Sequence, residues 1–232
     1  MILYVNGCSH SAAAEAVNNH AFAEDDGQLW FMGRAPHPDN AKVAWGRKTA
    51  NILKLNLHLD AESASSNTRI IRTTENWLSR HPSHNDAIVA IQWSTWEREE
   101  WLIDGEYYQV NASGIDMVPE SAEQRYKEYI ANVDWRQKTL EWHDTIYNWH
   151  QDLLGRGIKH LFFNGNSTFA DVGDRKDWGI NYIDPYGDLT FDSYIRSQGI
   201  DTVMPGSYHF GPDGHAVWGK YFAQELVDRN LV

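Results

Sequence analysis

Short apolar runs alternate with amphipathic segments along the whole chain. The clearest run is 86–93, whose continuous apolar character is typical of a parallel strand covered on both faces. The other runs of strand length are 2–5, 57–59 and 158–163. Segments with helical spacing lie at 41–55, 68–80, 120–154 and 212–229. This alternation predicts one α/β domain over residues 1–232, a three-layer α/β/α sandwich around a mostly parallel, flavodoxin-like sheet.

Four further segments add detail to this prediction. Residues 20–40 are polar and interrupted by Gly and Pro, which predicts a long loop over the active face. Residues 96–120 are acidic and irregular, which predicts an insertion with a short hairpin around Asp104-Gly105. The long helix at 120–154 is expected to break near Val133-Asp134. Residues 164–207 are too many for a structureless loop, so we expect undetected elements there.

Composition restricts the class of protein. With 42% hydrophobic and 13% aromatic residues, the chain has enough apolar side chains for a sizeable core. A net charge of −12 disfavours nucleic acid and anionic membranes as partners. We find no apolar run long enough for a membrane span and no signal peptide, and we expect a cytoplasmic or virion-associated protein. The lone Cys8 excludes an internal disulfide. The oligomeric state, a homo-oligomer included, is left open.

The turn after the first apolar run carries the first candidate for chemistry. The order strand, Gly7 turn, helix places Ser9 at the carboxyl end of a parallel strand, where ligands bind in open α/β sheets. Ser9 is therefore a candidate nucleophile. The alternative is that Ser9 and Ser11 are helix N-caps, which is a common role of serine.

Two histidines near the other end of the chain could supply a base. Serine hydrolysis needs a hydroxyl, a base, usually a group that orients the base, and donors for the oxyanion. His209 lies in the loop before the last predicted helix and could reach Ser9. His215 lies about one turn inside that helix, where it could equally be a packed or capping residue.

These motifs resemble those of the SGNH, or GDSL-type, hydrolases, which are three-layer α/β/α esterases and acyl hydrolases. Gly7-Cys8-Ser9 occupies the position of the family's Gly-Asp-Ser turn, and 209–218 looks like its last element, with the catalytic histidine before the final helix. The resemblance implies that Ser9 is the nucleophile and His209 the base. Cys8 is an alternative nucleophile, because a helix N-terminus lowers a thiol pKa.

The chain departs from the family at three positions. Gly206 replaces the Asp three residues before the histidine, so Asp201 or Asp192 would supply the acid, or a Ser–His dyad would act alone. The family's oxyanion Gly falls around Ser65, whose backbone N–H could still donate. Ser94 replaces the family's Asn, and a nearby amide could help. The candidate substrate-binding and oxyanion residues are Ser65, Ser94, Asn166 and His215.

A divergent, phage-associated subset of this family looks more similar still. Its Gly-Cys-Ser-His turn, Ser-Asn-x-x-Ile-Ile-Arg helix start and Trp-Ser-x-x-x-Arg strand end match 7–10, 66–72 and 93–98. Arg98 then contacts a substrate anion or pairs with one of the neighbouring glutamates. With Glu97, Glu99 and Glu100 beside it, the salt bridge is favoured.

The sequence therefore predicts a serine ester hydrolase that acts on an acyl or acetyl ester of a small molecule or carbohydrate. The eleven tryptophans favour core packing, although exposed rings could also stack on a sugar. The alternative is a non-catalytic SGNH-like phage or assembly protein that binds a glycan or a protein. No metal or other cofactor is expected, because no spacing matches a zinc or iron motif. The alternative metal ligands would be His10, His209, His215 and Asp213.

Overall fold

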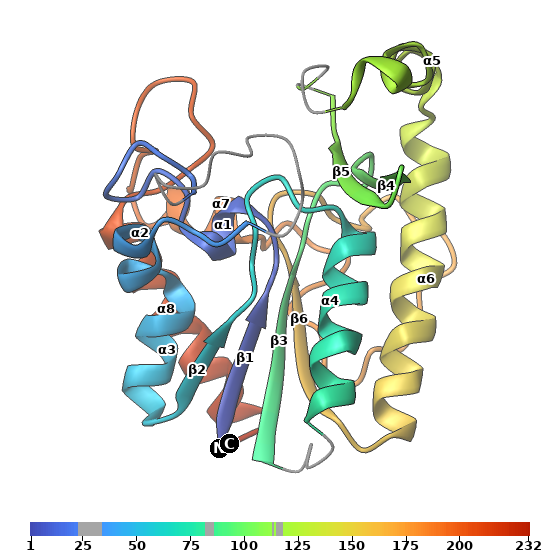
Figure 1. Cartoon of the computed structure of the whole chain (residues 1–232). Coiled ribbons are helices and arrows are strands. Elements are labelled where there is room, and N and C mark those ends of the chain that lie inside the picture. The colour runs from blue at the N-terminus through green and yellow to red at the C-terminus, as the bar shows by residue number, and fades with distance from the viewer. Residues whose placement is uncertain (23–33, 82–85, 113, 115–117) are drawn as a thin grey trace.

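Four parallel strands form the central sheet (Figure 1). The strands are β1 (Ile2–Asn6), β2 (Asn56–Leu59), β3 (Ala87–Trp93) and β6 (Lys159–Asn164). Their spatial order is β2-β1-β3-β6, and every pair is parallel. This is a flavodoxin-like order and confirms the predicted α/β/α sandwich. The computed structural model describes residues 1–22, 34–81, 86–112, 114 and 118–232.

Helices cover both faces of this sheet (Figure 1). Because side chains alternate along a strand, Leu3 and Val5 of β1 pack on one face and Tyr4 on the other. The layer over Leu3 and Val5 consists of α3 (Trp45–Leu53), α7 (Phe191–Ser197) and α8 (Pro212–Asp228). The layer over Tyr4 consists of α4 (Asn67–Arg80) and α6 (Trp135–Gly155).

Two predicted helices are divided in the structure. The helix expected at 41–55 is two helices, α2 (Pro38–Val43) and α3, because Ala44 between them is extended. The long helix expected at 120–154 breaks at Val133, as predicted. It comprises a 3₁₀ turn, η3 (Glu120–Ala122), then α5 (Glu123–Asn132) and α6, whose first turn is capped by Asp134.

The predicted insertion contains the expected hairpin. Strands β4 (Glu99–Ile103) and β5 (Glu106–Val110) pair antiparallel across Asp104-Gly105. Both turn residues have positive φ, 52° and 89°, as a two-residue type I′ hairpin requires. Trp101 and Tyr108 of the hairpin form a small core of their own with Tyr126 of α5.

Other connections are only partly as expected. The predicted loop at 20–40 has residues 23–33 outside the described part of the chain, and its other end forms α2. Within 164–207 the structure adds α7, which begins with a capping box between Thr190 and Ser193. Among the described residues, no helix is both long and apolar enough to cross a bilayer.

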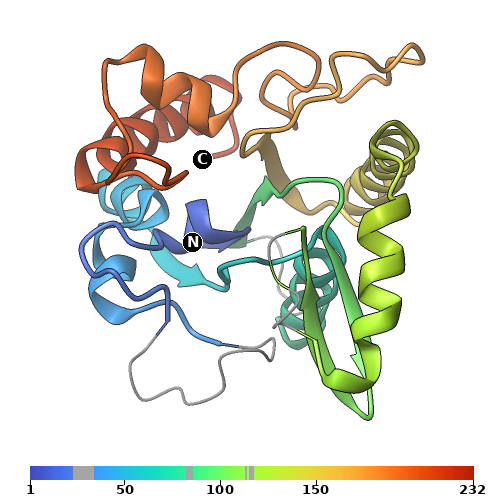
Figure 2. The ribbon, with the colours of Figure 1, turned by 90° about the horizontal axis from the view of Figure 1, so that it is seen from above.

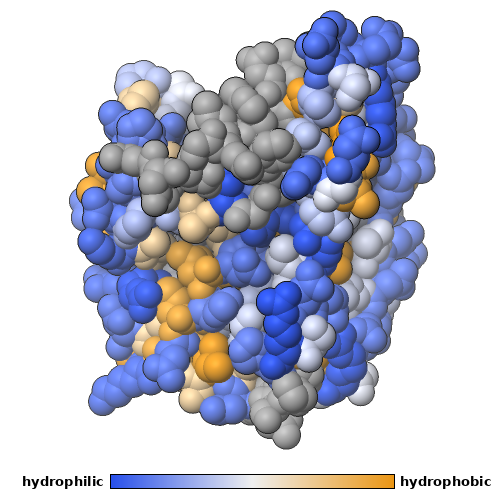
Figure 3. All heavy atoms as spheres, viewed as in Figure 1, coloured by the Kyte–Doolittle hydropathy of each residue, from blue (hydrophilic) through white to orange (hydrophobic). Residues whose placement is uncertain are grey.

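The carboxyl ends of the strands form one open end of the molecule. Seen from above, the short helix α1 (Ser9–Ala12) lies at the centre of this end, between the loop before α8 and the β4–β5 hairpin (Figure 2). The face viewed in Figure 1 is mostly hydrophilic, with apolar side chains gathered over α3 and the edge strand β2 (Figure 3). The end of the sheet at which the strands have their carboxyl ends is therefore surrounded by loops (Figure 2).

Acid should destabilise this fold through a buried histidine pair. His150 Nδ1 lies 2.8 Å from His160 Nε2, and His160 Nδ1 lies 2.8 Å from the Ile158 carbonyl, which can only accept. His160 Nε2 must therefore accept from His150, and protonating it breaks the bond. Burial lowers the pKa of His160 to about 4 from 6.5. The contribution of His160 to the free energy of unfolding is fully present above pH 6.5. It is lost as the pH falls towards 4, which lowers the free energy of unfolding by up to about 3 kcal/mol.

Urea unfolding between pH 7 and pH 4 measures this loss. His160→Gln should lose stability less steeply with falling pH than the wild type, whatever its stability at pH 7. His20→Gln, at an exposed position, should keep the wild-type slope. Equal slopes for His160→Gln and the wild type would contradict the prediction.

Candidate active site

Ser9 is the first residue of α1, directly after the turn that ends β1. The N-cap of this helix is Cys8, and its side chain makes no capping bond. Ser11 donates instead to Gln92. The N-cap alternative for Ser9 and Ser11 is therefore wrong, because the N-cap is Cys8 and both serines lie inside the helix. Ser9 is 7% exposed and lines a cavity at the top of the sheet.

The Gln92 side chain holds the turn against β3. Its Oε1 accepts from the Cys8 amide at 3.1 Å and from Ser11 Oγ at 3.2 Å. Its Nε2 donates to the Trp93 carbonyl at 2.7 Å. A Cβ on Gly7 would lie within 2.9 Å of both Ser11 and Gln92, so only glycine fits this close approach.

The same network separates the two candidate nucleophiles. Cys8 Sγ lies 3.3 Å from Gln92 Oε1 and is 4% exposed, so the thiol is engaged with the amide. Within the part of the chain that the structure describes, Ser9 Oγ has only a weak contact, to Cys8 Sγ at 3.9 Å. The hydroxyl is therefore the less constrained of the two groups.

His209 is held by a carboxylate that the sequence did not indicate, Glu15. His209 Nδ1 lies 2.8 Å from Glu15 Oε2, and Ser207 Oγ donates to the same oxygen at 3.0 Å. Because a carboxylate only accepts, Nδ1 carries the proton and Nε2 is left as the free, basic nitrogen. Burial raises the pKa of Glu15, but the hydrogen bonds from His209 and Ser207 outweigh this and hold that pKa below its usual value.

The backbone at Glu15 has an unusual conformation. Its φ is +63°, in the left-handed region that residues other than glycine rarely adopt. The helix has already ended at Ala12, followed by Ala13 at φ +55°. Two left-handed residues in three redirect the chain, and Glu15 reaches the loop before α8.

His10 ties the same loop to α1 from the other side. Its Nε2 lies 3.0 Å from the Tyr208 carbonyl, so Nε2 is the donor, and its ring stacks on Phe191 at 5.1 Å between centroids. Burial, together with the nearby His209, lowers the pKa of His10 to about 3. His10 is therefore neutral and positions the segment that carries His209, whose ring centroid is 6.0 Å away.

The cavity has a volume of about 410 Å³ and brings together four of the predicted site residues, Ser9, His209, Ser94 and Asn166. Ser94 Oγ is buried without a hydrogen-bond partner, and its backbone N–H is occupied by Asn67 Oδ1 at 2.8 Å. Its hydroxyl is therefore a donor available to a ligand. The other lining residues are Cys8, His10, Ser63, Ala64, Thr95, Glu97, Arg98, Asn111 and Tyr208.

The other acids and the predicted backbone donor lie elsewhere. Asp192 pairs with the Arg196 guanidinium at 2.8 Å and is the main cause of its raised pKa, to which the exposed Asp201 adds. Neither carboxylate takes the place beside His209 that Glu15 occupies. The Ser65 N–H donates to the Glu62 carbonyl at 3.1 Å, so it is not free for an oxyanion.

One residue before Ser65, Ala64 lines the cavity with a left-handed backbone, φ +66°. That conformation is the one in which glycine is most at home. Of this pair of residues, Ala64 rather than Ser65 therefore faces the cavity.

His215 does not line the cavity. It is buried in α8, with its ring 5.7 Å from that of Phe191, and burial lowers its pKa to about 3. It is thus a packed, neutral histidine. Within the described ranges, no group of three or more His, Cys, Asp or Glu side chains is arranged to hold a metal ion.

Arg98 does not form the salt bridge that its neighbours favoured. Glu99 pairs with Lys138 at 2.8 Å and Glu100 with Arg72 at 2.6 Å, while Glu97 accepts from Thr95. Arg98 lines the cavity, and its Nε and Nη1 are buried without a partner. The preference for a salt bridge was wrong because two of the three glutamates are engaged by other cations.

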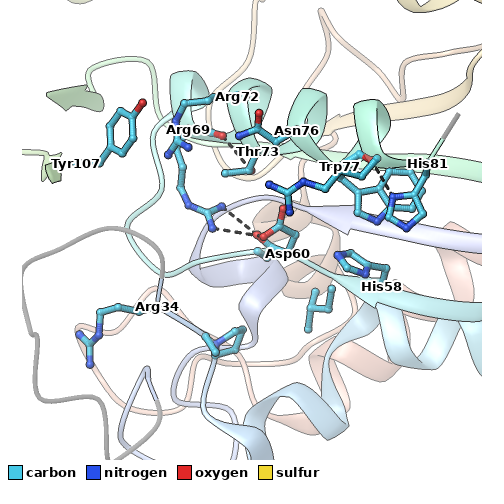
Figure 4. A pocket seen from close by; sticks show the side chains of 15 residues that line it. Arg34, His58, Asp60, Arg69, Arg72, Thr73, Asn76, Trp77, His81 and Tyr107 are labelled. Atoms are coloured by element: carbon cyan, nitrogen blue, oxygen red, sulfur yellow. Dashed lines mark hydrogen bonds and ion pairs between the residues drawn. The ribbon is translucent and has the colours of Figure 1, made fainter. Parts of the chain in front are cut away.

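A second cavity, of about 670 Å³, lies between α4 and the end of β2 (Figure 4). Arg69 in it pairs with Asp60 and with Glu62, at 3.6 Å and 2.7 Å. Thr73, a hydroxyl that lines this cavity, donates back to the Arg69 carbonyl. Among the residues described there, no histidine is paired with that hydroxyl, so this cavity is the weaker candidate for catalysis.

Most of the tryptophan side chains are buried in the core rather than exposed at the surface. Trp45, Trp93 and Trp218 are fully buried in the two large cores. The exposed ring beside the candidate site is instead Tyr208, which is 69% exposed and lines the cavity. Glu15 and Tyr208 are thus two residues that sequence reasoning missed. A glutamate within the alanine-rich run 12–16 was the available signal for the first.

Neither a protein-family model nor a curated protein matches the chain. Three solved structures are similar to it over nearly its whole length. A lipolytic protein of the G-D-S-L family from Desulfitobacterium hafniense DCB-2 is 10% identical with a TM-score of 0.39, covering 97% of this chain and 99% of that one. An acetyl xylan esterase from the rumen bacterium Butyrivibrio proteoclasticus is 12% identical with a TM-score of 0.44, covering 98% and 64%.

The third is a carbohydrate esterase family 2 enzyme with a carbohydrate-binding domain from Corynascus thermopiles (Myceliophthora fergusii). It is 12% identical with a TM-score of 0.45, covering 100% of this chain and 67% of that one. The chain thus spans about two thirds of the length of each carbohydrate esterase.

Proposed function

We propose that the protein is a serine ester hydrolase with the triad Ser9, His209 and Glu15. The observation that carries the proposal is the Glu15–His209 pair, 2.8 Å apart, at a cavity that Ser9 also lines. The carboxylate leaves His209 Nε2 free to act as a base, which is the role that the third member of a triad serves.

The reaction would follow the acyl-enzyme course. Ser9 Oγ attacks the ester carbonyl carbon while His209 Nε2 takes the hydroxyl proton. The tetrahedral intermediate collapses, the C–O bond to the alcohol breaks, and His209 returns the proton to the leaving alcohol. Water, activated by the same histidine, then hydrolyses the acyl-enzyme and releases the acid.

The oxyanion needs donors close to Ser9. The free hydroxyl of Ser94 and the amide of Asn166 line the same cavity, and Ala64 is the candidate for the backbone donor in place of Ser65. Each such donor is worth about 10²–10³ in rate. His215 is given no role in this proposal, because it is buried in α8.

The substrate would be an acyl or acetyl ester of a small molecule or carbohydrate. A cavity of about 410 Å³ suits a ligand of that size. The exposed ring of Tyr208 at the cavity provides a flat apolar surface on which a sugar could pack. The cytoplasmic or virion-associated location, and the likeness to the phage-associated subset, stay predictions.

The alternative, a non-catalytic protein that binds a glycan or a protein, is favoured by one observation. Among the described residues, Ser9 Oγ has only a weak polar contact, to Cys8 rather than to His209. Catalytic hydrogen bonds often tighten only when substrate binds, so this geometry does not remove the enzyme proposal.

Ser9→Ala should abolish hydrolysis of 4-nitrophenyl acetate, with kcat lowered by at least about 10³-fold, because no other hydroxyl takes its place in the triad. Steady-state kinetics and labelling by a fluorophosphonate measure the effect. Cys8→Ala is the matched control and should keep most of the activity. Equal rates for Ser9→Ala and the wild type would favour the binding protein, and loss of activity only in Cys8→Ala would make the thiol the nucleophile.

Glu15→Gln should lower kcat by about 10²–10⁴-fold with little change in KM, because a neutral amide no longer fixes the histidine tautomer or stabilises the imidazolium. The acidic limb of the pH–rate profile should also move to lower pH, which a purely structural defect would not produce. Glu106→Gln, at an exposed position of the hairpin, should be unaffected. If Asp201→Asn lowered kcat in this way and Glu15→Gln did not, the acid would be Asp201.

A further inference from the structure

Among the charged side chains that line the candidate active site, Arg98 has the most buried polar atoms without a hydrogen-bond partner. Its Nε and Nη1 are buried and have no hydrogen-bond partner, and among the described residues no carboxylate lies within ion-pair distance of it. A guanidinium stays charged at any physiological pH, so it cannot relieve this burial by losing a proton. Arg98 as a whole is half-buried, but burying two of its N–H donors without a partner is costly, and an anion in the cavity would compensate for this.

The position of Arg98 places its charge in the cavity where the proposed reaction takes place. It lines the same cavity as Ser9 and His209. A group bound by Arg98 therefore belongs to the molecule whose ester bond reaches Ser9. The guanidinium presents N–H donors in a planar fork, which matches the two oxygens of a carboxylate.

Glu97 adds the opposite chemistry to the cavity wall. It is 6% exposed, its Oε1 accepts from Thr95 Oγ1 at 3.0 Å, and its Oε2 is buried without a partner. An ionised carboxylate accepts hydrogen bonds and would repel an anion, so Glu97 favours hydroxyl groups. The cavity thus offers one site for an anion and a separate site for hydroxyl donors.

We propose that the substrate is an O-acyl ester of a hydroxylated carboxylic acid, such as an acidic sugar acylated on a hydroxyl group, with its free carboxylate held by Arg98 and a second, unacylated hydroxyl held by Glu97. This inference rests on the proposed esterase function for the bond that is cleaved, but not for the binding of the acid. Arg98 would set specificity and would take no part in proton transfer.

A pair of acetyl esters tests specificity. Acetylated methyl glucuronoside and acetylated methyl glucoside differ only in a carboxylate against a hydroxymethyl group. The wild type should favour the acid by at least 10-fold in kcat/KM. Arg98→Gln should remove this preference by lowering kcat/KM for the acid at least 10-fold while changing the neutral ester less than 3-fold. Arg136→Gln, an exposed position in the first turn of α6, is the control and should leave both values unchanged.

Equal kcat/KM for the two esters in the wild type would overturn the proposal. So would an equal loss on both esters in Arg98→Gln, because Arg98 would then support the fold or the reaction itself rather than recognise the acid.

Binding to Ser9→Ala separates this inference from the proposed function. Titration with methyl glucuronoside, which has no ester, should give saturable binding that Arg98→Gln weakens at least 10-fold and Arg136→Gln does not. If no ester is hydrolysed but this binding is present, the esterase fails and the anion site stands. If methyl glucuronoside does not bind, the inference fails whatever the esterase activity. Tighter binding of glucose 6-phosphate than of methyl glucuronoside would overturn the carboxylate assignment.

Discussion

The amide of Gln92 is the interaction on which the candidate site depends. Its Oε1 accepts from the Cys8 amide and from Ser11 Oγ, which fixes the turn of β1 to the neighbouring strand β3. Because the turn is held at both its N-cap and its third helical residue, Ser9 between them has a defined place at the top of the sheet. A slip of the strand register by one residue would move Gln92 to the opposite face and release the turn. The position of the hydroxyl is thus a property of the sheet rather than of a loop.

Strain at Glu15 is the cost of bringing a carboxylate to His209. A left-handed residue other than glycine costs about 1–2 kcal/mol, and hydrogen bonds to a charged group contribute about 1.5–3 kcal/mol each in return. Glu15 accepts two such bonds, from His209 and Ser207. The observed strain is therefore offset locally. The same carboxylate oxygen accepts from the loop before α8 and fixes the tautomer of His209, so Glu15 contributes to geometry and to chemistry together.

The sequence predicted the sheet well, because each strand is a short apolar run whose burial the fold must satisfy, and because Asp104-Gly105 suits only a tight hairpin. It could not predict the break at Ala44, since alanine has no preference for an extended residue between two helices. Glu15 was missed for a related reason. An alanine-rich run favours a continuous helix, whereas tertiary contacts 194 residues away end it at Ala12. Short-range patterns in the sequence therefore predict the helices and strands. Contacts between residues far apart in the sequence determine which side chains form the site.

The net charge of −12 opposes an anionic substrate at first sight. Screening decides which charge matters, because exposed charges more than about 8 Å apart are largely screened at physiological ionic strength. Groups that are partly or fully buried in a cavity wall are screened less, so the half-buried Arg98 and the buried Glu97 dominate the field that a bound ligand meets. The acidic surface would then slow the approach of an anion without weakening its final contacts. Raising the ionic strength should accordingly affect the association rate of an acidic ligand more than its dissociation rate.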